Sequence, residues 1–391
     1  MGARKVKIKT QHQFLAIILF LFILFTFILS VAASKQGTQK TEWKGEITTE
    51  NGVKVVKNPP DPLYGKIKLE LEEDLSIGRE DDENYMFFRV RGIAIDGQQN
   101  IYVTDSGNYR IQKFDRSGVY LQTIGRQGQG PGEFEWTMEL RIDESTGNIY
   151  VKDGPYYIEK FDRKGNHMEA VRLEKSIWSF DLTEDNDFLA TQSTTSDTEH
   201  TKTLCKVSSK GEIIENYAQY PWQISRQRKG ERTTTVISHG VYDLFMANIE
   251  NQNFVYGYSR DYELNVIDSK GQALYKVKKD ESPKNYSAEE RKKDKNQSLP
   301  PYSPFFYSLI TDSKGRIYVQ RNRTRGEEFK VNREVDIFSK DGYFLYKSTI
   351  PRGTYIIKDG FLYAYVMNED TGEELVKRYR IKNWKQIKEG M

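Results

Sequence analysis

The strongest constraint on the fold is a self-similar repeat of about 47 residues. The run NIYVTDSGNYRIQKFDRSGVYLQTIGR (Asn100–Arg126) matches NIYVKDGPYYIEKFDRKGNHMEAVRLE (Asn148–Glu174). Weaker copies follow, and the glycines of the equivalent turns are spaced 47, 46, 60 and 71 residues apart. These glycines are Gly118, Gly165, Gly211, Gly271 and Gly342. Self-similarity of this period indicates a repeat architecture, whereas a β-sandwich would show strands without such a match.

Each repeat holds four strand-like runs separated by turns. In the first complete repeat these runs are Arg91–Asp96, Asn100–Thr104, Ile111–Phe114 and Val119–Ile124. Gly97 and Gly118 lie in tight turns between them, where glycine supplies the positive φ angle that such turns need. Aromatic residues make up 13% of the chain, which suits strands that are half buried. Four short antiparallel strands at this repeat length predict the blade of a β-propeller.

The two ends of the chain predict how the ring closes. The segment LSIGR (Leu75–Arg79) matches QTIGR (Gln122–Arg126) one period later, so Lys66–Ile77 is expected to be an outermost strand. No other strands of its blade precede it. Near the C-terminus three strands lack a fourth: Thr354–Lys358, Phe361–Val366 and Leu375–Ile381. Joining the two sets completes one blade and removes two open sheet edges.

We therefore predict an all-β fold, a six-bladed β-propeller over residues 65–384. Its blades are four-stranded and antiparallel, and its ring is closed by the N-terminal strand together with the C-terminal strands. Residues 385–391 are expected to form a tail. Residues 34–64 contain Lys, Thr, Gly, Asn and Pro with little periodicity, which is typical of a linker.

One apolar segment, Phe14–Ala33, precedes this body and is predicted to be a helix. A helix of its twenty residues spans a hydrocarbon core of roughly 30 Å. Residues 1–13 contain four basic residues and no acidic one, so the positive-inside rule keeps them in the cytoplasm and sends the body across the membrane. Val31–Ala33, followed by Ser34, fits a cleavage site. The segment is thus a transmembrane anchor or a signal peptide, and the body lies in the cell envelope or is secreted.

Charge limits the class of partner. Without the basic residues Arg4, Lys5, Lys7 and Lys9, the chain has 55 basic and 56 acidic residues, a net charge of −1. Nucleic-acid binding depends on neutralising phosphates, so no nucleic-acid partner is expected. The single cysteine, Cys205, cannot form an internal disulfide. It lies in a strand-like run, where we expect a small core residue.

The stretch from Val90 to Glu174 resembles the NHL-repeat proteins. The resemblance is carried by GIAID (Gly92–Asp96), NIYVTDSGNYRIQKFD (Asn100–Asp115) and the glycine-rich joint IGRQGQGPGEF (Ile124–Phe134). It covers two blades and fades over the other four, apart from GRIYVQ (Gly315–Gln320). The resemblance implies a six-bladed propeller of the kind found in bacterial envelope proteins. That family includes binding scaffolds, sensor domains and a few enzymes, so function must be argued from the site.

Connectivity indicates which face carries the function. When the strands of a blade are lettered a to d from the centre outward, the a–b and c–d turns lie on one face. These turns are short, and we call this the short-turn face. The b–c turns and d–a joints lie on the other, loop-rich face, which carries four long insertions: Thr191–Thr203, Gln219–Gly240, Lys279–Pro304 and Gln320–Arg333. Loops on a rigid scaffold commonly carry binding residues.

On the loop-rich face we expect binding residues, chiefly of the Arg and Tyr types that dominate binding hot spots. They are Asn108, Tyr109, Arg110, Tyr156, Tyr157, Arg260, Tyr262, Arg321 and Arg323. Each alone is compatible with a solvated loop side chain, and the case depends on their sharing one face. The first hypothesis is a non-enzymatic binding or scaffold module for a protein, peptide or glycan of the envelope.

The sequence contains few signs of enzyme chemistry. Of the histidines, only His200 and His239 fall in the insertions, fewer than the three ligands typical of a catalytic zinc site. Asp105 and Asp153 follow equivalent strands and suit either a calcium site or, more commonly, the capping of turns. No catalytic residue, metal ligand or cofactor is therefore predicted. The alternatives are a metal-dependent hydrolase or lyase, with its site at the mouth of the central channel, and a sensor ectodomain.

Overall fold

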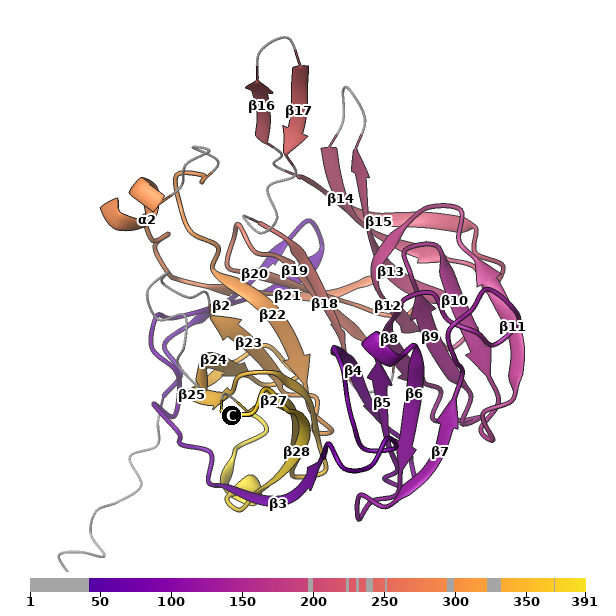
Figure 1. The fold of residues 1–391 in the computed structure, drawn as a ribbon. Coiled ribbons are helices and arrows are strands. Elements are labelled where there is room, and N and C mark those ends of the chain that lie inside the picture. Colours follow the sequence, from indigo (N-terminus) through magenta and orange to yellow (C-terminus); the bar gives the residue numbers. More distant parts are fainter. Residues whose placement is uncertain are drawn as a thin grey trace, which may run out of the picture. The chain divides into compact units, whose positions relative to one another are not determined.

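The computed structural model describes residues 42–195, 200–222, 225–229, 232–236, 242–249, 252–293, 299–321, 332–368 and 370–391. These residues form a six-bladed, all-β propeller, as the repeat predicts (Figure 1). The chain divides into two units, Met1–Trp43 and Lys44–Met391, and the whole propeller belongs to the second unit.

Blades 1 to 3 are antiparallel sheets, each built from four consecutive strands. Blade 1 contains β4 (Val90–Ile95), β5 (Ile101–Asp105), β6 (Arg110–Phe114) and β7 (Tyr120–Ile124), with the short 3-10 helix η1 (Ser106–Asn108) between β5 and β6. Blade 2 contains β8 (Thr137–Ile142), β9 (Ile149–Asp153), β10 (Tyr157–Phe161) and β11 (His167–Arg172). Blade 3 contains β12 (Ile177–Leu182), β13 (Phe188–Thr195), β14 (His200–Val207) and β15 (Ile213–Pro221).

Blades 4 to 6 follow the same plan with additions. Blade 4 contains β18 (Leu244–Asn248), β19 (Phe254–Tyr258), β20 (Glu263–Ile267) and β21 (Ala273–Lys279), extended by β2 (Val53–Asn58) and β1 (Glu46–Glu50). Blade 5 contains β22 (Phe306–Thr311), β23 (Ile317–Arg321), β24 (Asn332–Phe338) and β25 (Phe344–Pro351). Blade 6 contains β26 (Thr354–Lys358), β27 (Phe361–Met367), β28 (Glu374–Ile381) and β3 (Leu71–Ile77).

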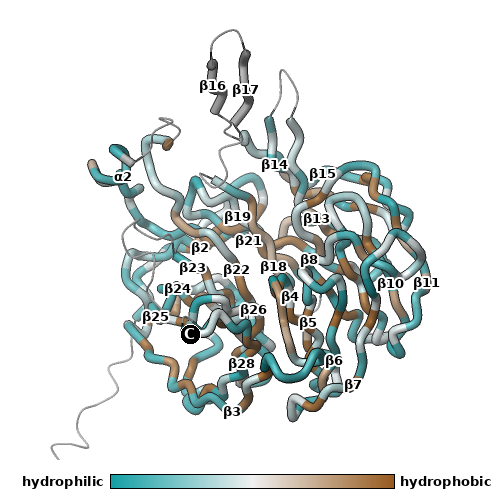
Figure 2. The backbone as a smooth tube through the Cα atoms, viewed as in Figure 1, coloured by the Kyte–Doolittle hydropathy of each residue, from teal (hydrophilic) through white to brown (hydrophobic). Residues whose placement is uncertain are grey.

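The second strand of a blade lies between two neighbours within its sheet and is packed against the adjacent blades. For this reason β5, β9 and β19 are buried at every position. Their sequences are mostly apolar rather than alternating, as expected for strands covered on both faces. Figure 2 shows the same distribution, with apolar residues following the strands and hydrophilic residues in many of the connections.

The ring closes between the two ends of the propeller, as predicted. Strand β3 pairs antiparallel with β28, so the outermost strand of blade 6 comes from the N-terminal side of the chain. Ion pairs join the two strands, with 2.8 Å between Nε of Arg378 and Oδ1 of Asp74 and 3.0 Å between Nζ of Lys377 and Oε2 of Glu73. Residues more than 300 positions apart therefore complete one sheet.

An N-terminal strap, residues 53–77, crosses the outer edges of blades 4, 5 and 6. Its first strand, β2, pairs in parallel with β21 of blade 4. The backbone N–H groups of Leu63, Tyr64 and Ile67 then bond to carbonyls of β25 in blade 5 at 2.8–3.0 Å. The structure thus places strands at Glu46–Glu50 and Val53–Asn58, within the linker expected over residues 34–64. The physical reason is that Val55 and Val56 become fully buried against blade 4.

The C-terminal residues also pack on the propeller. A tail was expected over residues 385–391. The structure instead has the 3-10 helix η3 (Trp384–Gln386), which begins one residue before that range, and Ile387 after it is buried. The buried guanidinium of Arg316 lies 4.1 Å from the ring centre of Trp384. It also donates from Nη1 to the carbonyl of Ile387 at 2.8 Å. A cation on an indole face and a backbone hydrogen bond therefore hold this end of the chain on blade 5.

No helix within the described residues is long and apolar enough to cross a membrane. The apolar segment Phe14–Ala33 lies outside the described residues, so the anchor or signal peptide stays a prediction.

The insertions gather at one face, at the top of Figure 1. There β13 and β14 extend beyond β12, and a separate hairpin of β16 (Ser225–Lys229) and β17 (Arg232–Val236) belongs to the joint between blades 3 and 4. The joint into blade 5 contains the short helix α2 (Ala288–Lys293). Ser287 and Glu290 cap this helix reciprocally, at 3.2 and 2.8 Å. Residues 322–331 of the fourth insertion lie outside the described residues.

Candidate ligand-binding face and central channel

Exposed aromatic side chains gather on the loop-rich face. Six aromatic residues are at least 40% exposed among the residues whose side chains the structure describes. All six lie in d–a joints, at the b–c turn of blade 2 or at the start of β12: Phe88, Trp136, Tyr156, Tyr157, Trp178 and Tyr302. Single exposed apolar residues are ordinary, but an uneven distribution of large ones marks an interaction surface.

Two tryptophans flank the b–c turn of blade 2. The backbone N–H of Gly154 in that turn donates to the carbonyl of Trp136 at 2.8 Å. The carbonyl of Pro155 accepts from the N–H of the residue before Trp178 at 3.1 Å. These bonds place Trp136 and Trp178 on either side of the turn that carries Tyr156. The aromatic group therefore lies over blades 2 and 3, on backbone that is tied to the rigid ring.

Trp178 is braced by a buried cation. The Nζ atom of Lys202 lies 4.9 Å from the ring centre of Trp178 and 4.4 Å from that of Trp222. The same atom lies 3.0 Å from Oδ1 of Asp243. The Lys202 side chain is buried, whereas Trp178 is half exposed. Because a cation on an aromatic face is attractive, Lys202 holds the indole in a fixed position.

The innermost strands of the six blades enclose a central channel with a cavity of about 1660 Å³. Its wall is formed by residues of β4, β8, β12, β18, β22 and β26 together with their flanking turns. Trp178 and Asp243 are among the lining residues, so the braced indole lies at the mouth of this channel. A concave site at the centre of the loop-rich face is a natural place for a ligand.

A set of ion pairs crosses the channel wall below this mouth. Nε of Arg141 lies 3.1 Å from Oδ2 of Asp181, and Nη2 lies 2.5 Å from Oε1 of Glu139. Although burial lowers the pKa of Arg141, the two carboxylates outweigh that effect and raise it. At the short-turn end, Nζ of Lys358 lies 2.6 Å from Oε1 of Glu144. Ion pairs thus link the neighbouring blades 2 and 3 along the channel wall, and blades 6 and 2 at its short-turn end.

The structure gives Asn108, Tyr109 and Arg110 a role in holding the joint into blade 1. The side chains of Asn108 and Arg110 both donate to Oδ2 of Asp105 at 2.8 Å. Arg110 also donates to the carbonyl of Met86 at 2.9 Å. Tyr109 has a φ angle of 54° and packs against the core of the blades. The three side chains thus make contacts within the protein itself.

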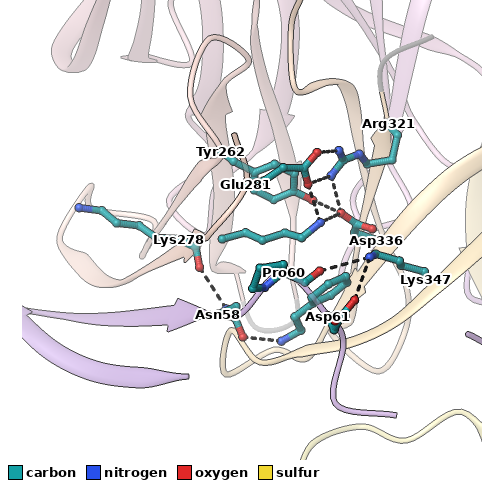
Figure 3. Close-up of polar contacts among 11 residues, drawn as sticks. Asn58, Pro60, Asp61, Tyr262, Lys278, Glu281, Arg321, Asp336 and Lys347 are labelled. Atoms are coloured by element: carbon teal, nitrogen blue, oxygen red, sulfur yellow. Dashed lines mark hydrogen bonds and ion pairs between the residues drawn. The ribbon is translucent and has the colours of Figure 1, made fainter. Parts of the chain in front are cut away.

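Two other expected site residues, Tyr262 and Arg321, meet in a buried ion cluster between blades 4 and 5 (Figure 3). Oδ2 of Asp336 accepts from the hydroxyl of Tyr262 at 2.6 Å, and from Lys279 and Arg321 at 2.7 Å each. Glu281 pairs with both cations, so two positive and two negative side chains balance one another. Tyr262 is 6% exposed and lies inside the protein.

The accessible members of the expected set are Asn108, Tyr156, Tyr157 and Arg260, which are exposed. Arg323 lies outside the described residues. Ligand binding by the set stays a prediction. Phe88 and Trp136 are not among the predicted binding residues, although their equivalent positions in two neighbouring blades could have indicated them. They occupy equivalent positions, since the N–H of each bonds to the aspartate that ends the second strand of its blade, at 2.7 and 2.6 Å.

Those aspartates, Asp105 and Asp153, cap the joints that lead into their blades. Burial raises the pKa of both, although the backbone hydrogen bonds that they accept oppose this effect. Within the described residues, no group of three His, Cys, Asp or Glu side chains is placed to hold a metal ion. His239 lies outside that part. Cys205 is buried, as expected of a core residue, and burial raises the pKa of its thiol to about 12.

The ion cluster makes stability depend on pH through Glu281. Burial by itself raises the pKa of Glu281, but hydrogen bonds from Arg321 and Lys279 outweigh it and lower the pKa from 4.5 to about 2. A carboxyl whose pKa is depressed in the folded state stabilises it fully above pH 4.5 and less as the pH falls toward 2. The contribution is at most about 3 kcal/mol.

We expect urea denaturation of the Glu281→Gln variant to show a stability deficit that narrows between pH 5 and pH 3. A deficit that is constant over this range would contradict the assignment.

The fold and this face define the class of the protein, a six-bladed β-propeller with one loop-rich, aromatic face around a central channel. A family model described as a 6-bladed beta-propeller, DUF5128, matches residues 82–298, more than half of the chain. The protein belongs to this family.

A solved structure with a TM-score above 0.5 agrees with the fold, and two others are similar at lower scores. A Bacteroides fragilis NCTC 9343 protein described as exported has a TM-score of 0.56 at 12% identity, over 84% of this chain and 99% of the other. A DUF4221 member from Bacteroides vulgatus has a TM-score of 0.48 at 12% identity, over 80% and 98%. Virginiamycin B lyase from Staphylococcus aureus has a TM-score of 0.42 at 9% identity, over 80% and 99%. The sequence matches no curated protein. At these identities the likeness concerns the fold alone.

Proposed function

We propose that the protein is an exported, non-enzymatic binding or scaffold module of the cell envelope, which recognises a protein, peptide or glycan on its loop-rich face. The observation that carries the proposal is that all six exposed aromatics of the described part lie on this face. Large, rigid aromatic side chains bind partners at a low cost in conformational entropy. The insertions on the same face add contact surface.

Export is supported by the apolar segment Phe14–Ala33 with its basic flank, and by the fold-level likeness to a protein described as exported. We further propose that the segment forms a helix that anchors or delivers the propeller. The NHL-type assignment of the repeats remains part of this proposal and is supported by the motifs of blades 1 and 2. No observation in the described residues favours the alternative of a metal-dependent hydrolase or lyase.

The binding face can be tested with two double variants. Replacing Phe88 and Tyr156 by Ala removes exposed rings from two blades of the loop-rich face, and we expect affinity for a captured envelope partner to fall at least about tenfold. Replacing Arg116 and Arg163 by Ala changes the short-turn face and serves as the matched control, with unchanged affinity. Both variants should keep the melting temperature of the parent. Loss of binding only in the arginine variant would reverse the assignment of the face.

A further inference from the structure

The part of the channel nearest the loop-rich face, which we call the upper channel, collects polar side chains from several blades. Arg91 is the second residue of β4, and Ser179 follows Trp178 in β12. Asp243 directly precedes β18, Ser308 lies in β22, and Gln320 is the penultimate residue of β23. All of them line the same cavity. The connectivity of the blades puts these positions toward the loop-rich end of the bore.

Four of these side chains are free to bond a ligand. Among the described residues, Arg91, Ser179, Ser308 and Gln320 have no hydrogen bond or ion pair to another protein group. They offer guanidinium donors, two hydroxyls and one amide, a mixture of donors and acceptors. Polar groups in a cavity need partners, which are water or a ligand. The complement of such a wall is a molecule with many groups that both donate and accept, as hydroxyls do.

Trp178 adds an apolar platform to this polar wall. Its indole is half exposed and held in place by Lys202, which Asp243 fixes in turn. The face of an aromatic ring carries partial negative charge and attracts the weakly positive C–H groups of a saturated ring. A pyranose has both features in one molecule, a face of C–H groups and an edge of hydroxyls. The combination of a braced indole with unpaired polar side chains therefore suits a sugar better than a peptide.

The charged side chains along the channel indicate what net charge a bound sugar should carry. At the upper channel the charged side chains are Arg91 and the pair of Lys202 with Asp243, and deeper in the bore Arg141 is paired with Glu139 and Asp181. At the short-turn end the lining is acidic, with Asp143, Glu144, Glu184, Asp312 and Asp359 against the one lining cation of that end, Lys358. The acidic short-turn end would repel an anionic glycan that enters the bore. It would attract a cationic glycan away from the upper channel. The charge distribution favours a neutral ligand.

We propose that the upper channel is a binding site for a neutral glycan, with one pyranose ring against Trp178 and hydroxyls along the glycan bonded to Ser179 of blade 3 and to Ser308 and Gln320 of blade 5. This inference rests on the proposed function, because it places the ligand at the centre of the loop-rich face and names its chemical class.

The test is a titration of the full chain in detergent with neutral hexasaccharides: maltohexaose, cellohexaose, xylohexaose, mannohexaose and chitohexaose. We expect at least one of them to bind saturably by calorimetry. Trp178→Ala in blade 3 and Gln320→Ala in blade 5 should each weaken that binding at least about tenfold. Met168→Ala is the matched control, since Met168 is as exposed as Trp178 but lies in the outermost strand of blade 2 and does not line the cavity, and it should leave binding unchanged.

Three results would overturn the site: no binding of any hexasaccharide, binding only of the charged probes oligogalacturonate or chitosan hexamer, or an equal loss in the Met168→Ala variant. Failure here is separable from failure of the proposed function. A protein partner that is lost on changing Phe88 and Tyr156, in the absence of glycan binding, leaves the loop-rich face as the binding face and removes the glycan site. Glycan binding that is lost in both Trp178→Ala and Gln320→Ala supports the site directly.

Discussion

Replacing Lys66–Ile77 with a Gly/Ser linker of equal length is expected to abolish the single cooperative unfolding transition of the propeller. The replacement removes the side chains of β3 and leaves β28 as an open sheet edge. It also removes Leu69 and Ile77 from the core, where each fully buried side chain contributes about 1.5–3 kcal/mol. Together with the ion pairs of Asp74 and Glu73, this loss is comparable with a total stability of about 5–15 kcal/mol.

The matched control for this replacement uses the other end of the same N-terminal region. Replacing residues 44–52 with an equal linker removes β1, which only adds to a blade that already has four strands of its own and β2. Its midpoint in urea should stay close to that of the parent chain. If the replacement of Lys66–Ile77 also unfolds at the parent midpoint with the same steepness, closure of the ring contributes nothing to stability.

The propeller fold could be predicted from the sequence because the sequence signals for its strands and turns are local and periodic. The four strands of blade 1 were expected within one residue of β4, β5, β6 and β7, since glycine turns and KFDR ends mark their limits. Ring closure could be predicted because LSIGR matches a motif one period later, which marks the strand before it as an outermost strand. By contrast, β1 and β2 were not foreseen, because β2 pairs with β21, more than 200 residues away, and such a long-range partner leaves no periodic mark.

The site was less predictable, because exposure and partnership depend on packing between blades. Tyr262 precedes β20 directly and reads as a turn residue, yet it packs between blades and bonds to Asp336. Arg321 ends β23 and reads as a free rim cation, yet Glu281 and Asp336 engage it. Trp178 reads as an ordinary strand residue, and only the channel geometry shows that it lines a cavity.

Asp336→Ala is expected to lower the free energy of unfolding by about 3–5 kcal/mol, the usual cost of leaving a buried charge without its partner. One oxygen of Asp336, a residue that is 2% exposed, accepts hydrogen bonds from Tyr262, Lys279 and Arg321. Without it, two buried cations share the single carboxylate of Glu281. Urea denaturation at neutral pH measures the loss.

Two further variants separate this charge effect from simple truncation. Adding Lys279→Met to Asp336→Ala removes one charge of each sign, so we expect at least half of the lost stability to return, because balanced removal of a buried pair is tolerated. Glu169→Ala breaks the exposed pair with Lys160 and should cost less than about 1 kcal/mol. Should the double variant be no more stable than Asp336→Ala alone, unbalanced charge is not the cause of the loss, and lost packing is.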